Sequence, residues 1–535
     1  MDAPKCASTE NGSCAEVTLV LRCCQDKCRW KLRESPHFRM KLAIDRIDIL
    51  KFVRMHGCIK MTTEVRTRKV KFALILLVAA YTPVSVKAQT NSPTMPINAD
   101  SNSEDPLSSP ESSYPKPLAP LEASHCWKSC DEQSGCDSPA VCCEENRKES
   151  LLDGFKSKLE ERGIEYDFFA TQFFQGVAAG GVEQSWPYGG KLDLFNGIDC
   201  KKSGLWQGLF VDTHLETRLG QSVNNIDGLL APSNIAMAFP EPDENVTALT
   251  GLKVSQALSE NFVLFAGKIN TLDEFPVRYN REMGLGRPGL SGFMNTSLVF
   301  NPIAARTVPY AAAGTGFAVV EGKEPLFSFC VFDPEERAVE GLENLFERGV
   351  VLVPDFIFRI KPLGLPGTYN LGGTYSSAKY RSVDPAAYLN IDLPPGAFPE
   401  ESGSWSLYLN SYQALWVDPS NERRTWGLFS LLGLSDGNPN PIQYTAAVGI
   451  GGQVMRAGRP ADTFGLGVFQ LGLSDQFKAL AIPIQPQQDE FGLECFYNAA
   501  LTKNVRLTGD VQFVRPSTQA FDTAIIPGLR LVAAF

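Results

Sequence analysis

The chain has 535 residues, of which 44% are hydrophobic and 21% are charged. This composition excludes a disordered or collagen-like chain, but not a β-barrel, because alternating strands average to a middling hydropathy. Residues 1–88 hold 17 Lys and Arg against 8 Asp and Glu, whereas residues 89–535 hold 33 against 52. The acidic main part excludes nucleic acid as a partner, since like charges repel.

An apolar stretch near the N-terminus predicts a secretory signal peptide over residues 61–88. The uncharged run 72–86 is too short for a membrane-spanning helix, which needs about 20 residues. Basic residues precede this run, namely Arg66, Arg68, Lys69 and Lys71. A small residue, Ala88, stands before Gln89 and predicts cleavage between the two. A buried core helix is the alternative interpretation.

Residues 1–60 are basic and Cys-rich and show no clean hydrophobic period. Met61 stands where a signal peptide of this kind begins. Our hypothesis is therefore that residues 1–60 are an extension upstream of the native translation start. N-terminal sequencing of the precursor tests this hypothesis.

Two segments follow the expected cleavage site. Residues 89–125 are rich in Ser, Pro, Asn and acidic residues, which predicts a flexible linker. Residues 126–148 are Cys-rich, and cysteines of an exported protein favour disulfide bonds. The candidates are Cys126, Cys130, Cys136, Cys142 and Cys143. The odd count leaves one thiol for Cys200 or for an intermolecular bond, and a zinc site is the weaker alternative.

From residue 149 onward the chain predicts one short helix and then strands. Leu151, Phe155 and Leu159 have helical spacing, and Gly163 ends the pattern, so we predict an amphipathic helix over 149–163. Sixteen segments with period two follow within 164–535. They are 164–180, 187–199, 207–220, 245–257, 261–270, 314–322, 326–334, 349–362, 367–380, 404–418, 424–436, 444–456, 461–474, 489–502, 505–516 and 522–535.

The pattern of these strands predicts an all-β fold, a transmembrane antiparallel β-barrel of about 16 strands. In the last strand Leu529, Leu531 and Phe535 share one face and Arg530 lies on the other, as a lipid-facing wall around a wet lumen requires. A soluble β-sandwich would show the same alternation. Two features favour the membrane: the chain ends on the apolar Phe535, and short connections alternate with long ones. We therefore expect a bacterial outer-membrane protein, exported through a cleaved signal peptide.

The third predicted strand carries four ionisable residues on one face. Asp212, His214, Glu216 and Arg218 lie two residues apart, so all four side chains project from the same side of the strand. Charged groups are costly against lipid, so we expect this face to line the lumen. An ion-pair ladder that only stabilises the wall is the alternative.

Other candidates for the channel lining lie on and after the strand 261–270. Lys268 and Asn270 are placed like the four ionisable residues, and Asn295 and Arg306 belong to the long connection 271–313. A connection of this length is often functional, and in a channel it can fold inward and narrow the lumen. No catalytic set, metal site or cofactor is predicted, because the signals for a hydrolase around His214 are weak.

Several stretches together carry a resemblance to a known family. They are GLWQGLFVDTHLETRLG (204–220), LFAGKINTLDEF (264–275), NTSLVFNPIAARTVPYAAAGTGFAV (295–319), WSLYLNSYQALW (405–416), GLSDGNPNP (433–441), DTFGLGVFQLGLSD (462–475), ECFYNAALTKNVRLTGDVQFV (494–514) and GLRLVAAF (528–535). In their order and spacing they resemble the OprB-type carbohydrate-selective porins, and the similarity covers about 151–535. The Cys-rich segment 126–148 and the extra N-terminus depart from the family pattern.

The resemblance implies passive diffusion of small sugars through a barrel with a charged and polar constriction. Carried over to this chain, the best candidates for that lining are Glu216, Arg218, Lys268 and Arg306. The implied partners are sugars, outer-membrane lipid and the barrel-assembly machinery that reads the terminal Phe535, with a homotrimer by analogy. Two other classes stay open, a barrel-embedded hydrolase and a non-channel structural or adhesion barrel.

Overall fold

The structure is a computed structural model that describes residues 23–24, 27–28, 151–241, 245–276, 292–322, 324–389, 397–456 and 458–535. The chain forms two compact units, Met1–Ala99 and Asp100–Phe535. In the first unit, β1 (Cys23–Cys24) and β2 (Lys27–Cys28) pair antiparallel. The predicted signal peptide, linker and Cys-rich segment lie outside the described residues.

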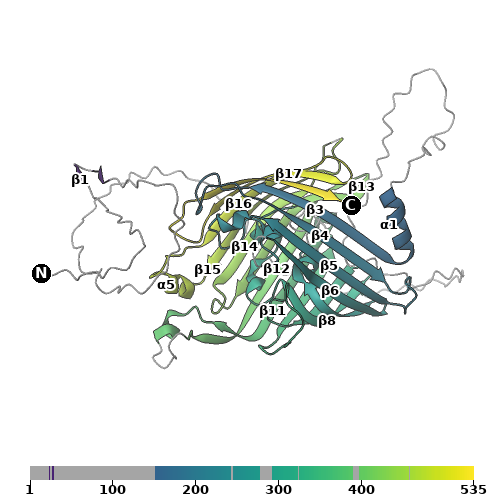
Figure 1. Cartoon of the computed structure of the whole chain (residues 1–535), viewed down its shortest axis with the longest axis horizontal. Coiled ribbons are helices and arrows are strands. Elements are labelled where there is room, and N and C mark those ends of the chain that lie inside the picture. The colour runs from purple at the N-terminus through teal and green to yellow at the C-terminus, as the bar shows by residue number, and fades with distance from the viewer. Residues whose placement is uncertain are drawn as a thin grey trace, which may run out of the picture. The chain divides into compact units, whose positions relative to one another are not determined.

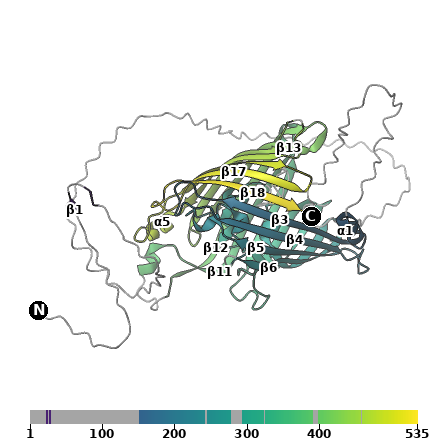
Figure 2. The ribbon, with the colours of Figure 1, turned by 45° about the horizontal axis from the view of Figure 1, so that its top comes forward.

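The second unit contains a closed barrel of sixteen antiparallel strands, in which each strand pairs with its neighbours in the sequence and β18 closes on β3 (Figures 1 and 2). The strands are β3 (Ile164–Gln175), β4 (Tyr188–Asp199), β5 (Leu209–Gly220), β6 (Val246–Ser259), β7 (Phe262–Asn270), β8 (Ala311–Glu321), β9 (Glu324–Phe332), β10 (Val351–Ile360), β11 (Gly367–Arg381), β12 (Glu400–Asp418), β13 (Asn421–Ser435), β14 (Ile442–Gln453), β15 (Thr463–Leu473), β16 (Glu490–Ala500), β17 (Val505–Arg515) and β18 (Ala524–Ala534). The predicted fold class and all sixteen strands are confirmed.

The predicted strand ends shift by a few residues for local reasons. The first predicted strand reaches 180, but β3 ends at Gln175. Beyond it the regular ladder stops, because Val177 donates to the Ser185 carbonyl at 3.1 Å, although Ala178 and Ala179 still hydrogen-bond with Ile525. Conversely, β12 begins at Glu400, earlier than the predicted start at 404. The register shifts between Ser376 and Lys379, and beyond this shift the ladder with β11 continues to the pair Arg381 and Glu400.

A short helix precedes the barrel, as predicted. It is α1 (Leu151–Glu161), and it lies at the same end of the barrel as the C-terminus (Figures 1 and 2). Gly163 ends the helical segment with φ +79, a conformation that favours glycine, and leads directly into β3. Lys156 ties the helix to β3 through an ion pair with Asp167 at 3.4 Å.

Side chains on the strands alternate between a buried inner face and an exposed apolar outer face. In β13, Phe429 and Leu431 are buried, whereas Leu428, Leu432 and Leu434 are exposed. A row of exposed leucine side chains on one face of a strand is unfavourable in water. This face therefore requires an apolar surrounding. The alternation therefore separates a lipid-facing wall from the lumen.

The last residue extends the seam that closes the barrel. Its backbone N–H donates to the carbonyl of Phe168 at 2.9 Å, and the two rings lie 5.6 Å apart. The side chains of Leu529, Leu531 and Phe535 are exposed on the outer face, whereas Arg530 is fully buried on the inner face. The face assignment predicted for this strand is therefore confirmed.

Connections differ between the two barrel ends. At the end that carries α1 and the C-terminus they are 200–208, 260–261, 322–323, 361–366, 419–420, 454–462 and 501–504. At the opposite end they are 176–187, 221–245, 271–310, 333–350, 382–399, 436–441, 474–489 and 516–523. The longer connections carry the remaining helical turns: η2 (Val223–Asn225), η3 (Ile235–Met237), α2 (Thr271–Glu274), α4 (Thr296–Val299), η4 (Pro302–Arg306), η6 (Pro385–Leu389) and α5 (Asp475–Ala481), while η5 (Pro362–Gly364) lies at the other end. No helix in the described ranges is long and apolar enough to span a membrane.

Candidate functional site

The connection between β7 and β8 folds into the barrel and contacts its inner face on several sides. We call its described parts, residues 271–276 and 292–310, the inner loop. Three anchors hold the inner loop: one on β16 and β18, one on β12–β16 and one on β4–β7. Each anchor is built from side chains that the alternation of a strand turns inward.

The first anchor uses charged groups of β16 and β18. The Glu494 carboxylate accepts hydrogen bonds from the backbone N–H groups of Met294 at 2.6 Å and Asn295 at 2.9 Å. The Arg530 guanidinium donates to the Gly292 carbonyl at 2.6 Å. These charge-assisted bonds satisfy backbone groups of the loop that are removed from water.

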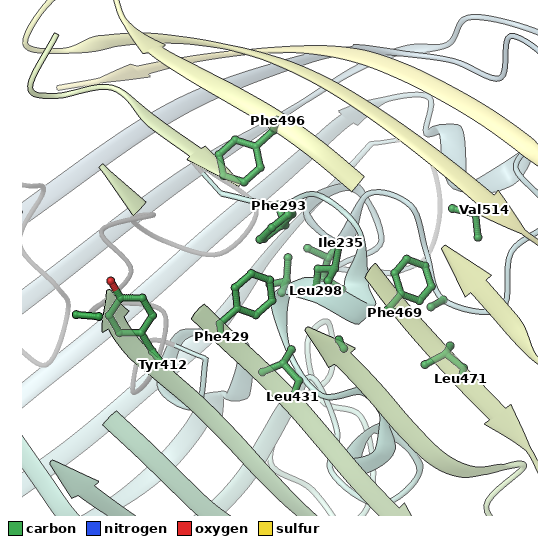
Figure 3. Packing of buried hydrophobic residues seen from close by; sticks show 14 residues of the cluster. Ile235, Phe293, Leu298, Tyr412, Phe429, Leu431, Phe469, Leu471, Phe496 and Val514 are labelled. Carbon is green, nitrogen blue, oxygen red and sulfur yellow. The ribbon is translucent and has the colours of Figure 1, made fainter. Parts of the chain in front are cut away.

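The second anchor is largely apolar and lies on the strands β12–β16. Phe293 packs edge-on to Phe496 at 4.9 Å and tilted against Phe429 at 5.3 Å (Figure 3). Asn301 donates to the Leu432 carbonyl at 2.8 Å and accepts from Thr445 at 2.6 Å. In the strand order β13 stands opposite β5 across the barrel, so the inner loop crosses the lumen.

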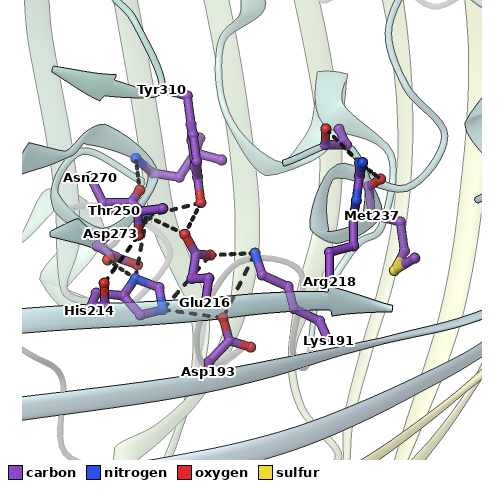
Figure 4. A network of polar contacts seen from close by, with 12 residues as sticks. Lys191, Asp193, His214, Glu216, Arg218, Met237, Thr250, Asn270, Asp273 and Tyr310 are labelled. Carbon is purple, nitrogen blue, oxygen red and sulfur yellow. Dashed lines mark hydrogen bonds and ion pairs between the residues drawn. The ribbon is translucent and has the colours of Figure 1, made fainter. Parts of the chain in front are cut away.

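The third anchor is a buried polar network on β4–β7 (Figure 4). His214 contacts Asp193 of β4 through Nε2 at 3.2 Å and Asp273 of α2 through Nδ1 at 2.6 Å. Glu216 pairs with Lys191 of β4 at 2.5 Å. Asp193 and Glu216 are direct cross-strand partners in the register of β4 and β5. This pairing brings both carboxylates beside the imidazole.

Asn270 and Tyr310 connect this network to both ends of the inner loop. The Asn270 amide donates to Glu216 at 3.1 Å, to Thr250 at 3.2 Å and to the Tyr310 hydroxyl at 3.1 Å, and its oxygen caps α2. The Tyr310 hydroxyl also donates to Glu216. Burial, together with the neighbouring Glu216 charge, holds the pKa of Tyr310 well above its usual value, so this phenol remains a donor.

The four predicted lumen-facing residues of β5 all point inward, with exposed fractions of 1–4%. His214 and Glu216 join the third anchor, whereas Asp212 pairs with Lys253 at 3.8 Å, and Lys253 also pairs with Glu274 of α2. Arg218 donates to the backbone carbonyls of Met237 at 2.8 Å and Ala238 at 3.1 Å. These side chains thus fasten inward-folded segments to the wall.

The other predicted lining residues occupy separate places. Lys268 donates to the Glu340 carbonyl at 2.8 Å in the connection 333–350. Asn295 caps α4 and donates to Gln512 at 3.1 Å. Arg306 lies at the end of η4, with its guanidinium over the Tyr380 ring at 4.9 Å. Of the predicted lining residues, Asn270 therefore lies in one network with His214 and Glu216. Lys268 and Arg306 lie outside this network.

Important members of the site were not singled out from the sequence. Lys191 and Asp193 alternate inward on β4, and Glu494, Asp510 and Gln512 do so on β16 and β17. Period-two alternation was the available signal. In KLDLF (191–195) Lys and Asp alternate with Leu, and in LECF (493–496) the charged Glu494 stands between the apolar Leu493 and Cys495. Of the predicted disulfide partners, only Cys200 lies in the described ranges, where it is a free, buried cysteine.

A closed antiparallel barrel with an apolar outer face, a polar inner face and a loop folded into its lumen defines a porin of the outer membrane. A model of the carbohydrate-selective porins, OprB family, matches residues 183–535. The chain belongs to this family, and the match begins after α1 and β3.

One solved structure supports the fold. The high-pH structure of OprB from Pseudomonas putida has 17% sequence identity and a TM-score of 0.62, covering 72% of this chain and 97% of that chain. OmpF of Salmonella typhi in complex with daunomycin has 9% identity and a TM-score of 0.42, covering 70% of this chain and 98% of that chain. Comparison with curated proteins gives no match.

Proposed function

We propose that this porin gives carbohydrates a passive route across the outer membrane, without a cofactor or an energy source. The observation that carries the proposal is the inner loop, which crosses the lumen between β5 and β13. We infer that the loop narrows the passage through the barrel. In a narrow passage, hydroxyl, amide and charged groups of the protein can replace the water molecules that hydrate each hydroxyl group of a sugar.

The buried charged residues act on this passage through the position of the inner loop. Glu216 is 1% exposed and His214 is 2% exposed, so direct contact with a passing sugar is restricted. Both bind the segments that begin and end the loop, at Asp273 and Tyr310. We infer that the eight predicted lining residues set the width of the passage. We infer also that the Tyr380 ring, 4.9 Å from the Arg306 guanidinium, offers an aromatic surface for stacking of a sugar.

The other elements of the proposal follow from the same class of protein. A signal peptide at 61–88 would export the chain, and the barrel-assembly machinery would read Phe535 at the closing seam. Outer-membrane lipid would surround the apolar outer face. A trimer is proposed by analogy alone.

Neither rival class fits the site as well. A hydrolase would need a nucleophile on His214, but Nε2 faces the carboxylates of Asp193 at 3.2 Å and Glu216 at 3.8 Å. A non-channel structural barrel gives no reason for a loop pinned across the lumen.

Planar-bilayer recordings and liposome-swelling assays test the proposal. We expect discrete channels, sugar-dependent modulation of their conductance, and swelling rates that fall with sugar size. If the folded protein forms no channels, or if sugars do not change the conductance of its channels, the proposal of a carbohydrate porin is wrong. Hydrolytic activity lost in His214→Ala would support the enzyme instead.

A further inference from the structure

We propose that Asp193, His214 and Glu216 form a binding site for a divalent transition-metal ion such as Zn²⁺. The three side chains come from adjacent strands, and one ligand atom of each lies within 4.8 Å of the others (Figure 4). All three residues are between 1% and 3% exposed. The inference concerns the wall of the barrel and does not depend on which solute the channel passes.

The spacing of the ligand atoms fits a small ion. Bonds of about 2.0–2.2 Å in a tetrahedron place neighbouring ligand atoms about 3.3–3.6 Å apart. In the structure His214 Nε2 lies 3.2 Å from Asp193 Oδ1 and 3.8 Å from Glu216 Oε1. One imidazole nitrogen and two carboxylate oxygens suit Zn²⁺ or Mn²⁺.

The orientation of the imidazole supplies a second argument. Asp273 lies 2.6 Å from Nδ1, as a carboxylate does when it accepts the Nδ1 proton of a metal-binding histidine. The Nε2 lone pair then points at the oxygens of two carboxylates, which repels unless a cation lies between them. A proton on Nε2 or a metal ion can fill this role.

The charges around the site also leave room for a cation. Asp193, Glu216 and Asp273 contribute three negative charges. The two nearby ammonium groups do not balance them, because Lys191 pairs with Asp193 and Glu216 while Lys253 is shared with two further carboxylates, Asp212 and Glu274. In addition, Asp193 Oδ2 is buried without a hydrogen-bond partner among the described residues. Lys191, 2.5 Å from Glu216, is the resident competitor that an incoming ion must displace.

Zinc binding to the purified full-length protein tests the proposal, with bound ions counted by equilibrium dialysis. We expect His214→Gln to bind one ion fewer than the wild type, because glutamine keeps a polar side chain but removes the imidazole ligand. Cysteines and other histidines near the N-terminus remain in both proteins, so their contribution cancels. Heat-modifiable gel mobility establishes that each variant is folded.

A second variant keeps the test independent of that substitution. Lys191→Met removes the competing cation and should raise the zinc affinity of the site about tenfold or more. Lys253→Met is the matched control, because Lys253 also pairs with carboxylates on the inner face, but these carboxylates, Asp212 and Glu274, are not proposed ligands. Equal ion counts in wild type and His214→Gln, or equal gains in Lys191→Met and Lys253→Met, would overturn the metal site.

Discussion

Arg530 is a buried arginine that ties the last strand to the inner loop. It donates to the Gly292 carbonyl at 2.6 Å and interacts electrostatically with the acidic pair Glu494 and Asp510. Arg530→Met leaves this buried acidic pair without its cation, so we expect a loss of about 3–5 kcal/mol in the free energy of unfolding. Urea unfolding of the barrel in liposomes measures this loss.

Arg530→Lys is the control for this prediction. Lysine keeps the positive charge but not the planar fork that reaches both Gly292 and Thr508. The loss should therefore be smaller than for methionine. Equal losses for both variants would show that the shape of the side chain, and not its charge, is what stabilises the wall.

Asp227 makes the stability depend on pH. It lies in the connection 221–245 and is 1% exposed, and burial raises its pKa from 3.8 to about 6 although Ser233 donates to it at 2.6 Å. A carboxyl group whose pKa is raised by folding stabilises fully below its unfolded pKa, and this contribution is lost as the pH rises through about 6. The shift corresponds to about 3 kcal/mol.

We expect the wild type to lose stability relative to Asp227→Asn between pH 4 and pH 7. Thermal unfolding midpoints of both proteins, measured across this range, give the comparison. The asparagine cannot ionise, so its curve should lack the step near pH 6. Parallel curves would contradict the assignment of the step to Asp227.

At the residue scale, the sequence predicted inward-facing residues better than their partners. Asp212, His214, Glu216 and Arg218 were placed on the correct face, because period-two alternation fixes the face of a residue. Their partners depend on strand register and on loops that return into the barrel, such as Asp273 beside His214. Neither is encoded in local spacing, so the network could not be derived from the sequence.

Among the elements, the inner loop is the one that controls the lumen. Phe293 is 2% exposed and packs between Phe429 and Phe496. Phe293→Ala removes this packing, which we expect to destabilise the loop by about 3–5 kcal/mol and to raise the single-channel conductance. Planar-bilayer recordings measure the change.

Phe491→Ala is the matched control, on the strand β16 that also carries Phe496. Phe491 is 44% exposed on the outer face of β16, so its truncation should leave the conductance unchanged. A rise in both variants would point to a general loosening of the barrel. A rise in neither would show that the inner loop does not limit the current.

The inward path of the loop could be suggested from its length, but its anchors could not. A long connection without strands is often functional, which is why 271–313 was singled out. The contact between Phe293 and Phe496 joins residues about two hundred positions apart in the chain. Such a contact follows from closure of the barrel, and local sequence carries no signal for it.

The fold of the whole barrel was predictable, because each strand repeats the same physical rule. Every strand must bury one face and expose the other, and a closed sheet leaves no edge. The structure adds what repetition does not specify, the closure of β18 on β3 and the crossing of the lumen. The alternation of faces is a local property of each strand. The closure of the barrel and the crossing of the lumen depend on the assembled molecule.

The orientation of the whole barrel in a bilayer leads to a prediction about depth. Leu428 and Leu434 are both exposed on the outer face of β13, but Leu428 lies at the middle of the strand and Leu434 near its end. Arginine at the midplane costs about 2–4 kcal/mol, and near the interface about 0–1 kcal/mol. Leu428→Arg should therefore destabilise folding into liposomes far more than Leu434→Arg, as measured by urea titration. A soluble barrel would tolerate both substitutions alike, since water surrounds both positions, so equal small effects would contradict a lipid-facing wall.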